Sequence, residues 1–243
     1  MSKHGRPDWY NITPMIQVHA SEDVNELAAR LKTLDAYDRR GNVVNVVDFA
    51  SGLGEIHQYY NGVGATQYLT YLPTYNGLPT VELAVGESNT AYSDIYGYVT
   101  PQQASTYGLE VIFALNPFTN VVFATLSVAD GTNIQTAGIK IDADHTKVYY
   151  YGPTATWTQV PGTYRLYGGG HLFHHLKFAF DFTNRQYLHM LLNSYAVSMT
   201  AYQPYQSVTT SAPYSSWYFS HLGNASRSNS CFLAGIIYTI NED

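Results

Sequence analysis

Residues 174–182, with the sequence HHLKFAFDF, decide the fold class of this chain. Large apolar side chains occupy every second position from Leu176 to Phe182, which is the period of a strand with one aromatic face in the core. A polar turn follows at residues 183–186, and residues 187–193, YLHMLLN, return as a second apolar strand. The segment therefore predicts an antiparallel β-hairpin within an all-β domain.

Short apolar runs of the same kind recur along most of the chain, separated by turns rich in Gly, Asn and Asp. The runs that predict further strands are 43–49, 80–85, 109–115, 121–128, 137–141 and 148–151. Many short strands at this spacing are typical of an antiparallel β-sandwich or jelly roll. We expect one such domain over residues 42–243.

Residues 1–41 differ from the rest and predict an N-terminal extended arm followed by one short α-helix. Ser21 can cap the start of the helix, and apolar residues then follow at spacings of three and four, which gives one apolar stripe. We expect this segment to dock on a partner or on the sandwich. The candidate assembly residues are Trp9, Tyr10, Val24, Leu27 and Leu31.

The order of four segments resembles the concanavalin A-like and laminin-G-like jelly rolls. These segments are 47–49 with the Gly-rich turn after it, 107–113, 175–181 and 191–193. The resemblance implies the same sandwich fold, in a superfamily that includes lectins, carbohydrate-binding modules and glycoside hydrolases. The opening RPDW at residues 6–9, with the helix after it, is similar to jelly-roll domains of phage and prophage structural regions.

Composition and charge exclude several classes of protein. The net charge is −6 and the 12 Lys and Arg are spread thinly, so no basic stripe exists for phosphates and we expect no nucleic-acid partner. No apolar run approaches the ~20 residues of a membrane span, and the first residues lack the apolar core of a secretory signal. We therefore expect cytoplasmic synthesis without membrane insertion. The single cysteine, Cys231, stands in an apolar run and predicts a core thiol.

The carboxylates do not form an obvious catalytic pair. Glycoside hydrolases of the resembled fold need two carboxylates on one strand, whereas Glu110 stands alone on its strand, so we expect no catalytic residues. Asp142 and Asp144 supply the hard oxygen ligands that calcium prefers, but Asp is also favoured in a solvated hairpin turn. Calcium is therefore the one cofactor that the sequence suggests, and no other is expected.

Aromatic runs provide the candidate binding residues. In each run the rings alternate, so one ring can enter the core while its neighbour faces outward. Outward Tyr and Trp rings could stack on sugar rings or anchor a subunit interface, and burial in the core is the competing interpretation. The candidate ligand-binding residues are Tyr150, Trp157, Trp217 and Tyr218.

The leading hypothesis from the sequence is a non-enzymatic structural or assembly protein on the surface of a phage-like virion, as a capsid decoration or tail-associated protein. Only 12% of residues are charged while 23 are tyrosines, which favours a protein rich in interfaces. The expected partners are further copies of the chain or a capsid, with glycans as ligands. A carbohydrate-binding module or lectin is the alternative, and a jelly-roll glycoside hydrolase is the third hypothesis.

Overall fold

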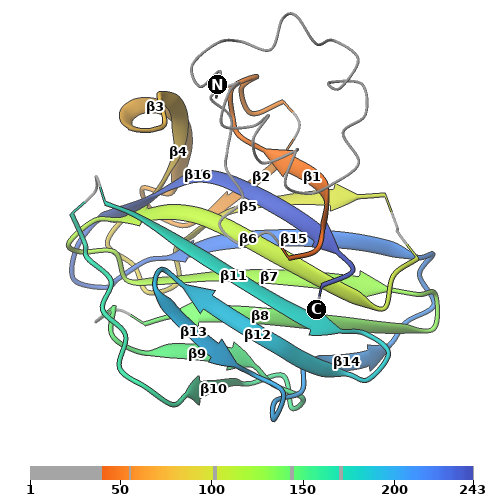
Figure 1. Ribbon diagram of the computed structural model, residues 1–243. Coiled ribbons are helices and arrows are strands. Elements are labelled where there is room, and N and C mark those ends of the chain that lie inside the picture. The colour runs from red at the N-terminus through yellow and green to blue at the C-terminus, as the bar shows by residue number, and fades with distance from the viewer. Residues whose placement is uncertain (1–39, 55, 101–102, 143–144, 170–171, 243) are drawn as a thin grey trace, which may run out of the picture.

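The structure is a computed structural model that describes residues 40–54, 56–100, 103–142, 145–169 and 172–242. Within these residues the chain forms two antiparallel sheets stacked as two layers (Figure 1). The described part contains no helix, so none of it could cross a membrane as a helix. The all-β antiparallel sandwich predicted from the sequence is confirmed, while the predicted arm and helix lie outside the described residues.

Each sheet contains eight strands, seven in a continuous order and one attached beside it. In sheet A the order is β13 (Tyr195–Ser198), β12 (Gln186–Leu192), β11 (Phe173–Asp181), β6 (Thr106–Leu115), β16 (Asn229–Ile240), β4 (Leu78–Val85) and β3 (Thr66–Tyr75), and β1 (Asn42–Val47) pairs with β16. In sheet B the order is β10 (Trp157–Val160), β9 (Val148–Tyr151), β8 (Asn133–Ile141), β7 (Val121–Ala129), β15 (Tyr214–Leu222), β5 (Tyr92–Val99) and β2 (His57–Asn61), and β14 (Tyr205–Val208) pairs with β8.

The predicted hairpin is strands β11 and β12, with Phe178 opposite Met190. Leu176, Phe178 and Phe180 are buried in the core between the sheets, as their period indicates. The Asp181 carboxylate accepts a hydrogen bond from a backbone N–H in the turn, at 2.8 Å, which stabilises the reversal of the chain. The hairpin therefore forms the local unit that the sequence predicts.

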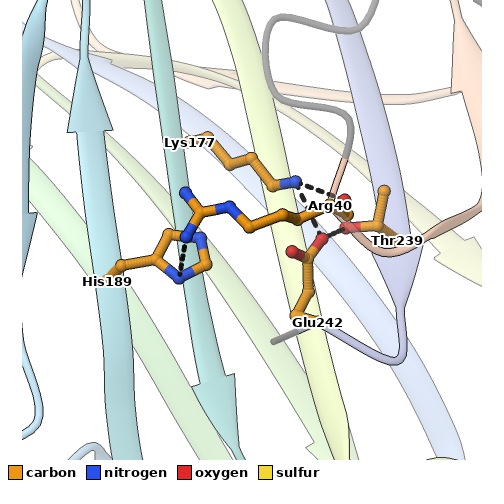
Figure 2. A network of polar contacts seen from close by, with 5 residues as sticks. All are labelled: Arg40, Lys177, His189, Thr239 and Glu242. Carbon is orange, nitrogen blue, oxygen red and sulfur yellow. Dashed lines mark hydrogen bonds and ion pairs between the residues drawn. The ribbon is translucent and has the colours of Figure 1, made fainter.

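The opposite face of β11 differs from the expectation of a half-buried strand. Lys177 is fully buried, and its ammonium lies 2.9 Å from the Glu242 carboxylate and donates a hydrogen bond of 2.7 Å to the Arg40 carbonyl oxygen (Figure 2). Thr239 donates to the same carboxylate, and Arg40 lies 3.4 Å from the His189 ring. The central strands of sheet A are thus buried on both faces. The pairing of polar groups on the outer face offsets the cost of removing them from water.

Sheet B keeps one face partly open to solvent. Along β7, residues such as Ala124 and Leu126 point into the core, while Phe123, Thr125 and Ser127 lie on the half-exposed outer face. This alternation is the ordinary pattern of an antiparallel sheet with one solvated side. The outer face of sheet B is therefore the surface on which side chains from several strands can form a site.

Cys231 lies in the core on β16 and is fully buried. Burial raises the pKa of its thiol well above the ordinary value of 9.0. The predicted role of Cys231 as a core thiol is confirmed.

Candidate functional site

An open groove crosses the outer face of sheet B. It has a volume of about 540 Å³. The groove is lined by Tyr96, Tyr98, Phe123, Thr125, Ser127, Thr136, Tyr151, Trp157, Ser216, Trp217 and Tyr218. These residues come from β5, β7, β8, β9, β10 and β15, so the groove depends on the register of six strands.

Strand register places a line of hydroxyl groups along the groove. The hydroxyl row consists of Tyr98, Ser216, Ser127, Thr136 and Tyr205, each opposite the next on a neighbouring strand. Because neighbouring strands lie about 4.8 Å apart, five such positions extend over about 19 Å. The Ser127 and Thr136 hydroxyl oxygens are 2.8 Å apart, so these two side chains are hydrogen-bonded to each other. The row therefore offers small polar groups over a length that suits an extended ligand.

A line of aromatic rings runs beside the hydroxyl row. The ring row consists of His57, Tyr96, Tyr218, Phe123, Trp157, Tyr151 and Tyr205. The centroids of successive rings are 4.9, 6.0, 6.0, 5.6, 5.1 and 5.6 Å apart. Separations of this size are the favourable range for aromatic pairs, so the rings hold one another in place.

A glycine makes room for the tryptophan of the ring row. A Cβ atom at Gly138 would lie 3.2 Å from the end of the Trp157 ring and 2.7 Å from the Thr125 methyl group. The end of the Trp157 ring therefore packs close to the backbone of β8, and a side chain at position 138 would push against both Trp157 and Thr125. This close packing explains why Trp157 is half-buried rather than projecting into solvent.

A buried carboxylate supports the ring row near its other end. The Asp94 carboxylate is 1% exposed and accepts hydrogen bonds from the hydroxyls of Tyr218 and Ser220. Burial raises the pKa of Asp94, and these two hydrogen bonds act in the opposite direction. Burial and the hydrogen bond to Asp94 raise the pKa of Tyr218, so its hydroxyl stays protonated and its ring keeps one orientation.

Two of the four predicted ligand-binding residues, Trp157 and Tyr218, have their rings in this groove. The ring of Trp217 does not face outward as a stacking ring would: it is 1% exposed and packs in the core over Gly97, where a Cβ would lie 2.5 Å from it. Trp217 borders the groove only from beneath. It alternates with Ser216 and Tyr218, which take the outer face.

Tyr150 also faces the core and not the groove. It is 9% exposed, and its ring lies 5.7 Å from Tyr187 and 4.5 Å from Tyr202. The reason is the register of β9, which pairs Tyr150 with the inward-facing Ile139. Its neighbour Tyr151 therefore takes the place in the ring row.

Sequence reasoning missed most of the other lining residues. Tyr96 and Tyr98 belong to an alternating aromatic run on β5, so the sequence signal that identified the other candidates applies to them too. Phe123 stands in an apolar run that predicts a core residue and gives no sign of an outward ring. The small hydroxyl residues carry no signal by themselves. Only the pairing of β5, β15, β7, β8 and β14 brings them into one line.

In the described part of the chain, the predicted calcium ligand Asp142 has no further potential metal ligands grouped around it. The Asp142 carboxylate accepts backbone N–H bonds of 3.1 Å from Thr146 and from Lys147, which is the contact expected in a hairpin turn. Asp144 lies outside the described residues, and no group of three potential metal ligands occurs among those that are described. The calcium site therefore stays a prediction.

The predicted assembly residues cannot be placed on the sandwich. All five belong to residues 1–39, outside the described part of the chain, and they are Trp9, Tyr10, Val24, Leu27 and Leu31. Their role stays a prediction.

No family model matches the sequence, and no curated protein is significantly similar to it. Solved structures do match. A protein of unknown function from Shewanella oneidensis is 12% identical, with a TM-score of 0.51, over 89% of this chain and 94% of that protein.

Two further matches have titles that mention carbohydrate. The carbohydrate recognition domain of Emp47p is 8% identical, with a TM-score of 0.50, over 84% of this chain and 99% of that domain. A carbohydrate esterase from the Shiga toxin-encoding bacteriophage phi24B is 13% identical, with a TM-score of 0.49, over 83% of this chain and 100% of that protein. At these identities the likeness concerns the fold alone, and it agrees with the antiparallel β-sandwich that the sequence predicts and the structure shows.

Proposed function

We propose that this protein binds carbohydrate chains in the groove across sheet B. The observation that carries the proposal is that the ring row and the hydroxyl row lie beside each other on one half-exposed face and meet at Tyr205. Sugar rings have apolar C–H faces that pack on aromatic rings, and hydroxyl edges that need hydrogen-bond partners. A groove with mostly aromatic walls and a few aligned polar groups supplies both kinds of contact.

The shape of the groove favours an extended ligand over a compact one. The two rows cross the strands, and the hydroxyl row alone covers about 19 Å at the usual strand spacing. The exposed ring of Tyr98 lies at one end of that row and the half-buried ring of Tyr205 at the other. A linear oligosaccharide can contact several rings in succession, so affinity should grow with the length of the chain.

Binding without hydrolysis is the proposed activity. Hydrolysis of a glycosidic bond requires two carboxyl groups about 5–10 Å apart on either side of that bond. The lining residues found in the described part of the chain include no Asp or Glu. The ring row contacts one buried carboxylate, Asp94, through Tyr218. This carboxylate already accepts hydrogen bonds from the hydroxyls of Tyr218 and Ser220.

A place on a virion surface is a separate part of the proposal. It rests on the composition of the chain and on the N-terminal segment, and a protein that decorates a particle can also bind glycans. The two ideas are tested independently, because the mass of the protein in solution, with and without residues 1–41, reports on assembly alone.

The carbohydrate proposal is tested by binding of the purified protein to an array of oligosaccharides of increasing length. Trp157→Ala should weaken binding at least tenfold, because it removes the ring that lies between Phe123 and Tyr151 in the ring row. Tyr71→Ala is the matched control, since Tyr71 is 70% exposed on the β3–β4 hairpin, which projects beyond the sheets (Figure 1). Equal binding by wild type and Trp157→Ala, or no binding to any glycan, would refute the proposal.

A further inference from the structure

Lys140 stands beside the part of the ring row that contains Trp157. It lies on the outer face of β8, opposite Phe123 of the groove. Its ammonium nitrogen is 4.5 Å from the centroid of the Tyr149 ring and 5.3 Å from that of the Trp157 ring. Since Trp157 lines the groove, the positive charge lies at the rim of the groove and next to its largest ring.

The charge of Lys140 is only partly compensated. Among the described residues no carboxylate forms an ion pair with its ammonium, and the two rings supply cation–π contacts in place of hydrogen bonds. The Asp142 carboxylate acts on Lys140 through its charge, and its Oδ1 accepts two backbone N–H bonds in the adjoining turn. Burial lowers the pKa of Lys140, with Asp142 acting in the opposite direction.

Cation–π contacts do not use the N–H donors of the ammonium as hydrogen bonds do, and no carboxylate of the described residues lies within ion-pair distance of them. An ammonium group partly removed from water gains most from an anion, because charge-assisted hydrogen bonds are about twice as strong as neutral ones. The lining residues of the groove in the described part of the chain include no carboxylate that would repel an anion. The rim near Trp157 is therefore suited to a negatively charged ligand group.

We propose that Lys140 binds an anionic substituent, a carboxylate or a sulfate ester, on the sugar chain in the groove. The inference rests on the proposed carbohydrate binding and narrows the ligand to acidic saccharides. The sugar unit that carries the anion stacks on Trp157, and the anion lies against the ammonium of Lys140. The hydroxyl row and the remaining rings contact the neutral part of the chain.

The test compares ligands that share one sugar backbone and differ in whether a substituent carries a negative charge. Oligogalacturonate is paired with its methyl ester, and a sulfated galactan oligomer with its desulfated form, and each is titrated calorimetrically against the full chain. Wild type should bind the acidic member of at least one pair about tenfold more tightly. Lys140→Gln should remove this preference, Lys140→Arg should retain it, and Arg227→Gln, which removes an exposed positive charge on the β15–β16 connection, should leave it unchanged.

The outcomes separate the two proposals. Equal affinity for the charged and neutral members, an acidic preference that survives in Lys140→Gln, or an array on which only neutral glycans bind overturns the role of Lys140 and leaves carbohydrate binding intact. Absence of binding to any glycan overturns both. The two pairs show whether the anion is a carboxylate or a sulfate, and thermal unfolding of each variant verifies that the sandwich is folded.

Discussion

Acidification should destabilise this protein through one histidine in its core. His221, on β15, is fully buried, and its Nδ1 lies 2.9 Å from the Leu83 carbonyl oxygen. Burial lowers the pKa of His221 to about 4, although the bond to Leu83 and the neighbouring Asn229 act in the opposite direction. The imidazole is therefore neutral in the folded protein at pH 7, and its Nδ1–H donates a hydrogen bond to the Leu83 carbonyl oxygen.

The expected magnitude follows from the difference between the folded and unfolded pKa values. In the unfolded chain the pKa is near 6.5, so the gap is about 2.5 pH units, and at about 1.4 kcal/mol per unit it corresponds to about 3 kcal/mol. The folded pKa is the lower one, so the unfolded chain takes up a proton that the folded protein cannot accept. The stabilisation is complete above pH 6.5 and is lost as the pH falls toward 4.

The assay is urea-induced unfolding at several pH values between 7 and 4, for wild type and for His221→Gln, which keeps a donor but does not titrate. The difference in free energy of unfolding between the two should shrink by about 3 kcal/mol over this range. His57→Gln, on the exposed strand β2, is the control and should follow wild type. If wild type and His221→Gln lose stability in parallel, the burial argument for His221 is wrong.

Three further predictions concern the core, two of them for substitutions and one for the reactivity of Cys231. Lys177→Met should lower the free energy of unfolding by about 3–5 kcal/mol in urea titrations, because it leaves the buried Glu242 carboxylate without its ammonium partner. Tyr187→Phe should cost about 1–3 kcal/mol by the same measurement, since the Gly138 N–H loses its hydrogen-bond acceptor. Cys231 should react with a thiol reagent such as dithionitrobenzoate only when the protein unfolds, because burial raises the pKa of its thiol, and fast labelling of the native protein would contradict this.

The fold class could be predicted from the sequence because the patterns that identify strands and turns lie within short segments of the chain. The alternation in residues 174–182 identifies a strand, and its return partner follows within one turn, so β11 and β12 were found correctly. The burial of Lys177 could not be predicted in this way. It depends on Glu242, which approaches from the far end of the chain.

The candidate site could be predicted only in part, for a related reason. A run such as Tyr149-Tyr150-Tyr151 shows that rings alternate, but not which ring faces the core. That choice depends on the register with β8, and a shift of one residue exchanges the two faces of a strand. Tyr150 was therefore predicted in the position that Tyr151 occupies, while Trp157 and Tyr218 line the groove and their role in ligand binding stays a prediction.

Beneath Trp157, strand pairing along one side of β8 is interrupted. Strand β9 pairs with residues 139–141 of β8, and β14 pairs with residues 133–136, so Gly138 has no strand partner on that side within the described sheet. The Tyr187 hydroxyl fills this place. It accepts a bond of 2.7 Å from the Gly138 N–H and lies 3.2 Å from the Gly138 carbonyl oxygen and 3.0 Å from that of Tyr151.

The same glycine therefore connects the core to the proposed site. Trp157 rests on the outer side of Gly138, and the Tyr187 hydroxyl holds its backbone groups. These hydrogen bonds occupy backbone groups that β9 and β14 leave unpaired, so their loss would weaken the sheet beneath Trp157. The position of Trp157, and with it the place where the ligand and Lys140 are proposed to meet, thus depends on a tyrosine that belongs to the other sheet.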